Sequence, residues 1–337
     1  MKEAMFYNKV NGKVKCKLCP HGCIISEGKR GICGVRENRN GKLYSLVYRK
    51  LVAKNVDPIE KKPLYHFYPG SKAYSIATVG CNFSCKHCQN YEISQPPRET
   101  GEIFGHDFSP EEIVAEAKRY NCEVIAYTYT EPTVFYEYAY ETAKLASKEG
   151  IKNIFVTNGY TSEEALKEIS PYLDGANIDL KAFTDKFYRE ICGARLEPVL
   201  ETIKLYKELG IWIEITTLVI PTLNDNEEEL RKIAEFIKSL GDEIPWHVSA
   251  FHPDYKLMNL PRTPLETLRK AYKIGKEVGL KYVYEGNVGE GENTYCYNCG
   301  KLLVRRYYHT TLENRITSDS RCYNCNAKIH GVGLKGE

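Results

Sequence analysis

The feature that most constrains the fold is an alternation of apolar, strand-length runs with helix-like segments between residues 73 and 287. Seven such runs, rich in β-branched residues, are Ala73–Gly80, Glu123–Thr130, Asn153–Thr157, Gly175–Leu180, Trp212–Ile220, Trp246–Phe251 and Lys281–Tyr284. Near-continuous apolar strands separated by helices indicate a parallel sheet that helices cover. The sequence therefore predicts an α/β fold with a full or partial (β/α) barrel, in which the carboxyl ends of the strands carry the chemistry.

Helix-start signals follow several of these runs. Ser109 precedes Pro110, and Glu112 stands at the third position after Ser109, which is the pattern of a capped helix. Ser162 and Asn226 are each followed directly by glutamates, which favours helix starts there as well. The predicted helices would cover the sheet from outside.

The chain of 337 residues has 13 cysteines, and most of them fall into three groups. No apolar run is long enough to span a bilayer, and the first residues lack the apolar segment of a secretory signal. We therefore expect a cytoplasmic protein, in which closely spaced cysteines bind metals rather than form disulfides. Cys122 and Cys192 stand apart, and we interpret both as buried core residues. The net charge of +3 predicts no general attraction to nucleic acid or membrane.

Three cysteines lie at close spacing directly after the first predicted strand: Cys81, Cys85 and Cys88. Iron–sulfur clusters are normally held by four thiolates, and closed structural zinc sites also have four ligands. Three thiolates on one loop, with no fourth cysteine nearby in sequence, leave one iron open for another ligand. The spacing therefore favours an open iron–sulfur site over a zinc site or unrelated thiols.

A second group lies near the N-terminus: Cys16, Cys19, Cys23 and Cys33. The glycines and the proline among them indicate turns rather than helix. Four thiolates at such spacing predict a closed metal site, either zinc or an auxiliary cluster. Zinc is slightly favoured, because small modules of this kind often need a metal to fold. His21 is an alternative ligand, although an exposed turn histidine is the simpler interpretation.

The third group consists of two matched CxxC pairs: Cys296, Cys299, Cys322 and Cys325. Such pairs predict a zinc-ribbon-like module. The segment between the pairs also offers charge and aromatic rings, in Arg305, Arg306, Tyr307 and Tyr308. Ribbons with these residues can bind nucleic acid. A ribbon that caps the barrel or docks a protein explains them equally well.

Polar residues follow the predicted strands, at the edge where the carboxyl ends of parallel strands meet. They include Glu131, Asn158, Asp179, Lys181 and His252. Asp179 and Lys181 are two residues apart on a strand and share one face, so both can point inward. The structural alternatives are a buried ion pair for these two residues and a packed core histidine for His252.

The loop Cys81–Cys88 at the first strand of such a barrel resembles the radical S-adenosylmethionine (radical SAM) superfamily. Within it, Thr130–Pro132, Asp179–Lys181 and Phe251–His252 resemble the glycyl-radical-enzyme activating branch, which includes pyruvate formate-lyase activating enzyme-like proteins. Residues 80–90, together with both outer cysteine groups, are similar to the radical enzyme of the AmmeMemoRadiSam system, which is encoded beside Memo-like and AMMECR-like proteins. The resemblance covers nearly the whole chain and implies a partial (β/α)6-type radical SAM barrel.

The resemblance also implies a chemistry. A [4Fe–4S] cluster would bind to Cys81, Cys85 and Cys88, with the amino and carboxylate groups of S-adenosylmethionine on the open iron. One electron would cleave the sulfonium to methionine and a 5′-deoxyadenosyl radical, which abstracts a hydrogen atom from a substrate. The task of the protein would be to orient the cofactor and to exclude water.

Motif by motif, the resemblance implies cofactor-binding roles for His87, Glu131, Asn158, Asp179, Lys181 and His252. Glu131 would hold the methionine amino group, and Asp179 and Lys181 would face the ribose and the carboxylate. His252 would line the cofactor.

Two positions depart from the pattern of the superfamily. Tyr129 and Thr130 stand where two glycines usually precede the acidic residue. His87 stands where a carbocyclic aromatic residue is common, although an imidazole ring can also stack on adenine.

The predicted organisation has three parts: an N-terminal metal module over residues 1–72, the barrel over 73–290, and a zinc-ribbon-like module over 291–337. The predicted activity is hydrogen abstraction from a protein partner, a Memo-like or AMMECR-like protein, with ferredoxin or flavodoxin as electron donor. RNA modification is the alternative within the same enzyme class. A non-catalytic scaffold with three structural zinc sites is the alternative outside it.

Overall fold

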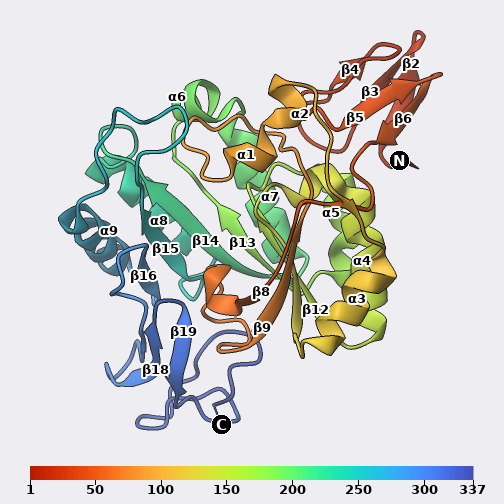
Figure 1. Cartoon of the computed structure of the whole chain (residues 1–337). Helices are drawn as coiled ribbons and strands as arrows, with labels where there is room; N and C mark the ends of the chain where they lie inside the picture. Colours follow the sequence, from red (N-terminus) through yellow and green to blue (C-terminus); the bar gives the residue numbers. More distant parts are fainter. Residues whose placement is uncertain (337) are drawn as a thin grey trace.

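The computed structural model describes residues 1–336, and its largest element is an eight-stranded sheet (Figure 1). In spatial order the strands are β16 (Val283–Gly286), β15 (Trp246–Ala250), β14 (Trp212–Val219), β13 (Gly175–Asp179), β12 (Lys152–Thr157), β11 (Val124–Tyr127), β9 (Lys72–Ala77) and β8 (Ala53–Pro58). In this sheet, β9 and the strands β11 to β16 pair in parallel, and β8 pairs antiparallel with β9. The parallel sheet predicted from the apolar runs is therefore confirmed.

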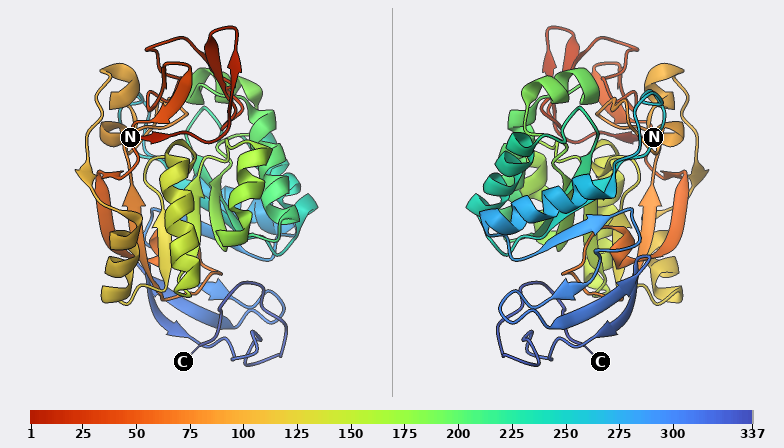
Figure 2. Two further views of the ribbon diagram at one scale, coloured as in Figure 1. Left: turned by 90° about the vertical axis from the view of Figure 1, so that its right-hand side faces the viewer. Right: turned by 90° about the vertical axis from the view of Figure 1, so that its left-hand side faces the viewer.

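A helix follows each parallel strand from β9 to β15 along the chain, and these helices lie on the outside of the sheet (Figure 2). They are α3 (Pro110–Arg119), α4 (Tyr136–Lys148), α5 (Glu163–Ile169), α7 (Leu196–Glu208), α8 (Glu227–Leu240) and α9 (Leu265–Val278). Shorter elements are η1 (Ile59–Lys61), α1 (Tyr91–Ser94), α2 (Pro96–Glu99), η2 (Pro132–Phe135), η3 (Ser170–Tyr172), α6 (Asp185–Phe187) and η4 (Tyr188–Cys192). Since β8 and β16 are the two edges of the strand order, the sheet is open, which excludes a full barrel and agrees with the predicted partial one.

The local sequence explains these elements. Every residue of β11 is buried, as expected of a strand that is covered on both faces. The helix α8 buries Leu230, Ile233 and Ile237 on one face, at the spacing of an amphipathic helix. The predicted cap at the start of α3 is confirmed, because Glu112 N–H donates to Ser109 Oγ at 3.2 Å and Ser109 N–H donates to Glu112 Oε2 at 2.6 Å.

The N-terminal region is built from small antiparallel sheets and has no helix within residues 1–40, as the turn signals predicted. Its strands are β1 (Lys2–Glu3), β2 (Tyr7–Val10), β3 (Lys13–Cys16), β4 (Ile24–Ile25), β5 (Arg36–Arg39) and β6 (Lys42–Ser45), and β7 (Lys50–Leu51) pairs with β10 (His106–Asp107). The region is attached to α4 by a fully buried ion pair between Arg36 and Glu137. The strand β8 lies within the predicted N-terminal part but pairs along its length with β9, so residues 53–58 belong to the barrel sheet.

The C-terminal region is a three-stranded antiparallel sheet of β17 (Thr294–Tyr295), β18 (Leu302–Tyr307) and β19 (Thr310–Asn314), which lies below the barrel in Figure 1. Its apolar residues share one buried cluster with Tyr65, Tyr282 and Tyr284 of the barrel. Arg306 crosses this boundary and donates from Nη2 to the Tyr65 carbonyl oxygen at 2.8 Å. Within residues 1–336, no helix combines the length and the apolar character that crossing a membrane requires.

Candidate active site

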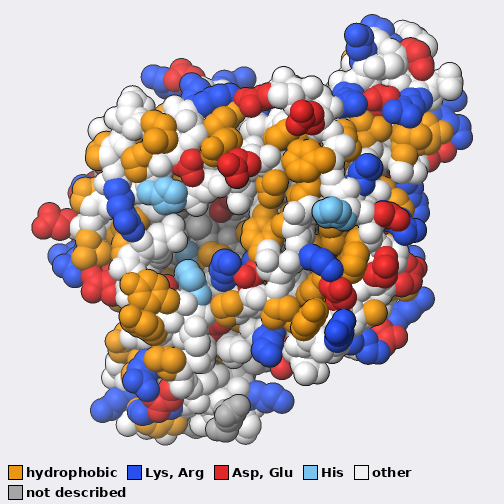
Figure 3. All heavy atoms as spheres, viewed as in Figure 1, with side chains coloured by type: hydrophobic (Ala, Val, Ile, Leu, Met, Phe, Trp, Pro, Cys, Tyr) orange, Lys and Arg blue, Asp and Glu red, His pale blue; other side chains and the backbone are white. Residues whose placement is uncertain are grey.

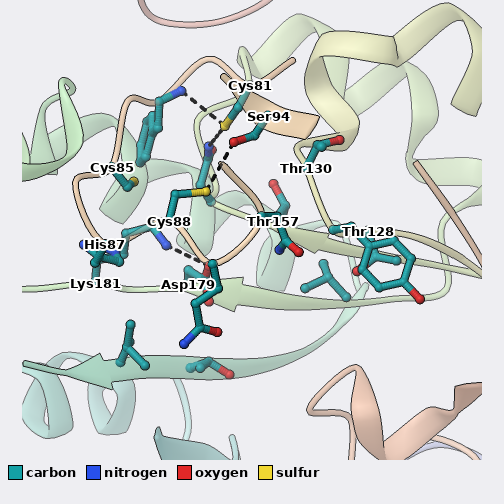
Figure 4. Close-up of a pocket in the computed structure, with 18 of the residues that line it drawn as sticks. Cys81, Cys85, His87, Cys88, Ser94, Thr128, Thr130, Thr157, Asp179 and Lys181 are labelled. Carbon is teal, nitrogen blue, oxygen red and sulfur yellow. Dashed lines mark hydrogen bonds and ion pairs between the residues drawn. The ribbon is translucent and has the colours of Figure 1, made fainter. Parts of the chain in front are cut away.

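A cavity of about 420 Å³ lies at the carboxyl ends of the parallel strands. Figure 3 shows the hollow on this face of the molecule, and Figure 4 shows the side chains that converge on it. The lining residues come from the ends of successive strands and include Thr128, Thr157, Asp179, Thr216 and Ser249. This is the edge of the barrel at which the sequence predicted the chemistry.

The cysteine loop forms one wall of this cavity, directly after β9. Gly80 has a φ of +104°, and a Cβ at this position would lie 2.6 Å from Val35 Cγ1, so a larger residue does not fit here. The segment η4 supports the loop from behind, because Ser84 N–H donates to the Cys192 carbonyl oxygen and Lys86 N–H to the Ile191 carbonyl oxygen, both at 2.9 Å. The loop is therefore held by a segment that lies far away in the sequence.

Cys81, Cys85 and Cys88 all line the cavity, as predicted. Cys88 Sγ lies 3.2 Å from Ser94 Oγ, and Phe83 N–H donates to Cys81 Sγ at 3.3 Å. Within residues 1–336, these three sulfurs are not a set whose members all lie within 4.8 Å of one another. The three sulfurs are thus too far apart for one zinc ion, and they fit a larger group such as a cluster.

His87 points into the same cavity and is nearly fully buried, yet neither ring nitrogen has a hydrogen-bond partner. Burial, with a smaller effect of the Lys181 charge, lowers the pKa of His87 to about 3, so the ring is neutral at physiological pH. Thr216 Oγ1 lines the cavity and also lacks a partner. Buried polar atoms without partners are rare, and these atoms fit a site that a polar ligand completes.

Asp179 and Lys181 both face the cavity, which confirms the expected side of the strand. Lys181 Nζ lies 2.8 Å from Asp179 Oδ2. Burial is the largest single effect and would lower the pKa of Lys181, but Asp179 together with the Cys85 and Cys192 sulfurs outweighs it and raises this pKa well above its ordinary value. The cavity therefore holds a permanently charged ammonium group beside a carboxylate that keeps one oxygen for other partners.

Glu131 lies one layer behind the cavity instead of lining it. Pro132 turns the chain into η2, and the buried carboxylate accepts hydrogen bonds from Thr133 N–H at 3.0 Å, Thr157 Oγ1 at 2.8 Å and Asn158 N–H at 2.8 Å. Burial raises the pKa of Glu131 in spite of these bonds. Asn158 does line the cavity, so in this structure Glu131 holds the backbone of a lining residue.

His252 is exposed at the rim of the cavity. Its Nε2 atom lies 2.9 Å from Gln89 Nε2, and Gln89 is a lining residue whereas His252 is not. His252 is therefore not a packed core histidine, which was the alternative interpretation from the sequence.

Several residues of the site carried no signal in the sequence. Ser94 and Thr216 face the cavity from α1 and β14, and neither belongs to a spaced motif. Cys192 is buried, as predicted for a core residue, but its backbone also supports the cysteine loop. These residues reach the site through tertiary packing, which a single sequence does not encode in a local pattern.

The two outer cysteine groups differ in geometry. All four C-terminal sulfurs lie within 4.8 Å of one another, with 3.6 Å between Cys296 and Cys325 and 3.7 Å between Cys299 and Cys322. The N-terminal four line one small cavity together with His21. The Nε2 atom of His21 is 2.8 Å from the Asn82 carbonyl oxygen, so this nitrogen is bonded to the cysteine loop of the active site.

Comparison with known proteins agrees with this geometry. Residues 75–237 match the family model of the Radical SAM superfamily. The chain is 52% identical over 334 residues to an uncharacterized protein of Methanocaldococcus jannaschii, covering 98% of this chain and 99% of that protein. It is 24% identical over 216 residues to the pyruvate formate-lyase-activating enzyme of Clostridium pasteurianum, covering 59% of this chain and 88% of the relative.

The fold is also similar to that of Streptococcus suis SuiB bound to S-adenosylmethionine. The TM-score is 0.52 at 14% sequence identity, and the match covers 68% of this chain and 53% of that chain. The residues matched by the family model include the three-cysteine loop. The chain therefore belongs to the radical SAM superfamily, as a radical SAM enzyme that is similar to activating enzymes.

Proposed function

We propose that this enzyme reductively cleaves S-adenosylmethionine at a [4Fe–4S] cluster held by Cys81, Cys85 and Cys88, and abstracts a hydrogen atom from its substrate. The observation that carries the proposal is the loop with three separated thiols, which opens into the cavity that contains the unpartnered ring of His87. When bound, the cluster would supply the electron that S-adenosylmethionine needs for cleavage.

In this proposal the lining residues bind and orient the cofactor. His87 presents a neutral ring to the adenine, which the absence of any other partner for its nitrogens supports. Lys181 binds the carboxylate of S-adenosylmethionine with its ammonium group, and Asp179 accepts hydrogen bonds from the ribose hydroxyls. Asn158 donates toward Cys81, and Glu131 positions Asn158.

At the rim, His252 and Gln89 form the side of the cofactor site that faces solvent. The hydrogen bond between these two side chains supports this placement, because it connects an exposed residue to one that lines the cavity.

We propose a protein as the substrate, and a Memo-like or AMMECR-like protein as its identity. The similarity to a pyruvate formate-lyase-activating enzyme supports a protein substrate. A low-potential donor such as ferredoxin or flavodoxin would supply the electron. Co-purification with each candidate, followed by intact-mass comparison before and after turnover, tests the assignment. Absence of both association and mass change for all candidates contradicts it.

We further propose that the C-terminal group binds Zn²⁺ in a zinc-ribbon-like module, and that the chain comprises the N-terminal module, the barrel and this ribbon. The sulfur separations of 3.6 and 3.7 Å support zinc, because tetrahedral Zn–S bonds require about 3.8 Å between sulfurs. None of the cysteines within residues 1–336 is paired in a disulfide, which supports a reducing, cytoplasmic location.

The two rival functions fit the geometry less well. The RNA-modification hypothesis depended on the charge and rings of the segment Arg305–Tyr308. Arg306 is fully buried against Glu60 and is not available to nucleic acid. The other three residues, Arg305, Tyr307 and Tyr308, are exposed. A scaffold with three zinc sites requires three tight sulfur sets, and within residues 1–336 only the C-terminal set is tight.

The test is anaerobic reconstitution with iron and sulfide, reduction, and measurement of 5′-deoxyadenosine. We expect the product from the wild type and from Cys122→Ser, which changes a buried cysteine outside the site. We expect no product from Cys85→Ser. Equal product from Cys85→Ser and the wild type, or none from a wild type that contains the cluster, contradicts the proposed function.

A further inference from the structure

The N-terminal cysteines have no role in the proposed reaction, although four thiols surround one cavity there: Cys16, Cys19, Cys23 and Cys33. The C-terminal cysteines show the sulfur-to-sulfur distances of a site that fits one zinc ion. All four C-terminal sulfurs lie within 4.8 Å of one another. This agrees with the separation of about 3.8 Å that a tetrahedral zinc site with four sulfur ligands requires.

The N-terminal sulfurs are more widely spaced than the C-terminal sulfurs. Within residues 1–336, no three of the N-terminal sulfurs all lie within 4.8 Å of one another, and the same is true of the active-site cysteines. The four cysteines nevertheless line one small cavity. Thiolates that bind to separate irons of one cluster are further apart than thiolates that share one ion. The N-terminal sulfurs are therefore spaced too widely to bind one zinc ion together, and their spacing suits a larger group.

A buried positive charge faces the same cavity. Arg36 lines it, is 1% exposed, and pairs through Nη2 with the Glu137 carboxylate. Its Nε atom is buried and has no hydrogen-bond partner. The remaining wall is largely apolar and includes Leu18, Ile25 and Val134. A buried donor without a partner in an apolar wall indicates an acceptor in the cavity, and the sulfurs of an anionic cluster are such acceptors.

The cavity also adjoins the active site. Asn82 lines the N-terminal cavity, while its neighbour Cys81 lines the active-site cavity. A Cβ on Gly80 would lie 3.5 Å from the Cys33 carbonyl oxygen, so the two cysteine loops are in direct contact. The His21 Nε2 contact with the Asn82 carbonyl oxygen joins the loops a second time.

We propose that Cys16, Cys19, Cys23 and Cys33 hold a second [4Fe–4S] cluster, and that this site does not bind zinc. With four protein ligands, this cluster has no open iron, so it can accept or pass on one electron but cannot bind S-adenosylmethionine. The inference replaces the slight preference for zinc that the sequence supported. It does not depend on the proposed reaction, because it concerns only which metal the N-terminal thiols hold.

The first test uses the full chain in which Cys81, Cys85 and Cys88 are all changed to Ala, purified anaerobically. The proposal expects about four iron and four sulfide per chain in this variant, and about eight iron and one zinc in the wild type. After reduction, the paramagnetic signal of the variant should not change when S-adenosylmethionine is added. Two zinc ions and no iron in the variant would overturn the proposal.

A second variant identifies which cysteines hold the remaining iron. In the triple-Ala background, Cys23→Ala should remove or reshape the signal, whereas Cys122→Ala should leave it unchanged. An unchanged signal in the Cys23→Ala protein would overturn the assignment. If the triple-Ala protein does not fold, the wild type decides the question by its metal content, since four iron with two zinc contradicts the proposal. Lack of 5′-deoxyadenosine with eight iron present would contradict only the proposed function.

Discussion

Asn158 donates a hydrogen bond from Nδ2 to Asn82 Oδ1 at 2.8 Å, and the same nitrogen lies 3.7 Å from Cys81 Sγ. This contact joins the end of β12 to the cysteine loop that follows β9. Because Asn82 also lines the N-terminal cysteine cavity, the pair lies between the two iron–sulfur sites that we propose. Glu131 fixes the other side of Asn158 by accepting its backbone N–H.

Substitution of Asn158 should slow cleavage of S-adenosylmethionine. Asn158→Ala removes a donor beside the Cys81 thiolate, and the loss of about 1.5 kcal/mol corresponds to roughly tenfold slower formation of 5′-deoxyadenosine. Asn158→Asp should be slower still, because a carboxylate would face both the thiolate and Asn82 Oδ1. The measurement is the initial rate at equal iron content. If the Asp variant is as fast as the wild type, Asn158 does not position Cys81.

Substitution of Lys181 should weaken cofactor binding. Lys181→Met leaves the carboxylate of Asp179 without its partner and removes the ammonium group that we assign to the carboxylate of S-adenosylmethionine. A lost charge-assisted hydrogen bond corresponds to about 1.5 to 3 kcal/mol, or a dissociation constant raised by roughly ten- to hundredfold.

The matched control for this change is Lys61→Met. Lys61 also lines the cavity, but its side chain is half exposed and pairs with Asp57 instead. Its substitution should leave the dissociation constant, measured by calorimetry on reconstituted protein, within about twofold of the wild type. Equal effects of the two substitutions would contradict a specific role for Lys181.

Substitution of Arg306 should destabilise the contact between the C-terminal sheet and the barrel. Arg306 is completely buried and pairs with Glu60, so Arg306→Met leaves a buried carboxylate without its partner, which costs about 3 to 5 kcal/mol. The neighbouring Arg305 is half exposed, and Arg305→Met should cost less than about 1 kcal/mol. Thermal unfolding of the two metal-loaded variants measures the difference. Equal midpoints would mean that Arg306 does not hold the module.

Mild acid should destabilise the same contact through His66. This residue lies 2.7 Å from the His330 carbonyl oxygen through Nδ1 and 2.6 Å from Tyr284 Oη through Nε2, and burial lowers its pKa to about 4. The unfolded chain, with an ordinary histidine pKa near 6.5, therefore binds more protons between about pH 6.5 and 4. The contribution of His66 to stability is complete above pH 6.5, and about 3 kcal/mol of it is lost as the pH falls to 4.

Comparison with His66→Gln isolates this effect from acid release of metals. Glutamine keeps a donor and an acceptor but does not titrate, so the unfolding free energy of the variant should depend less on pH in this window. Chemical denaturation at pH 7 and pH 5 measures both proteins under matched metal content. Parallel pH dependence of the wild type and the variant would contradict the assignment to His66.

The sequence by itself was enough to locate the parallel strands, the capped start of α3 and the three-cysteine loop. These signals are local: apolar β-branched runs, a capping box and cysteine spacing are each complete within a few residues. The inward direction of Asp179 and Lys181 was equally predictable, because alternate residues of a strand share a face. The edge strand β8 was not assigned to the barrel, because its polar residues lack the continuous apolar pattern of the other strands.

Only the tertiary structure decided which distant residues meet. Glu131 is a strand-end acid in the sequence, but the turn at Pro132 directs its carboxylate to Asn158 rather than into the cavity. Arg306 belongs to an apparently basic, exposed segment, yet packing buries it against Glu60. The separation of the sulfurs in each cysteine group also comes from packing. Cysteine spacing limits which thiols can meet, but the distances between them depend on how the surrounding backbone folds, and those distances distinguish a single ion from a cluster.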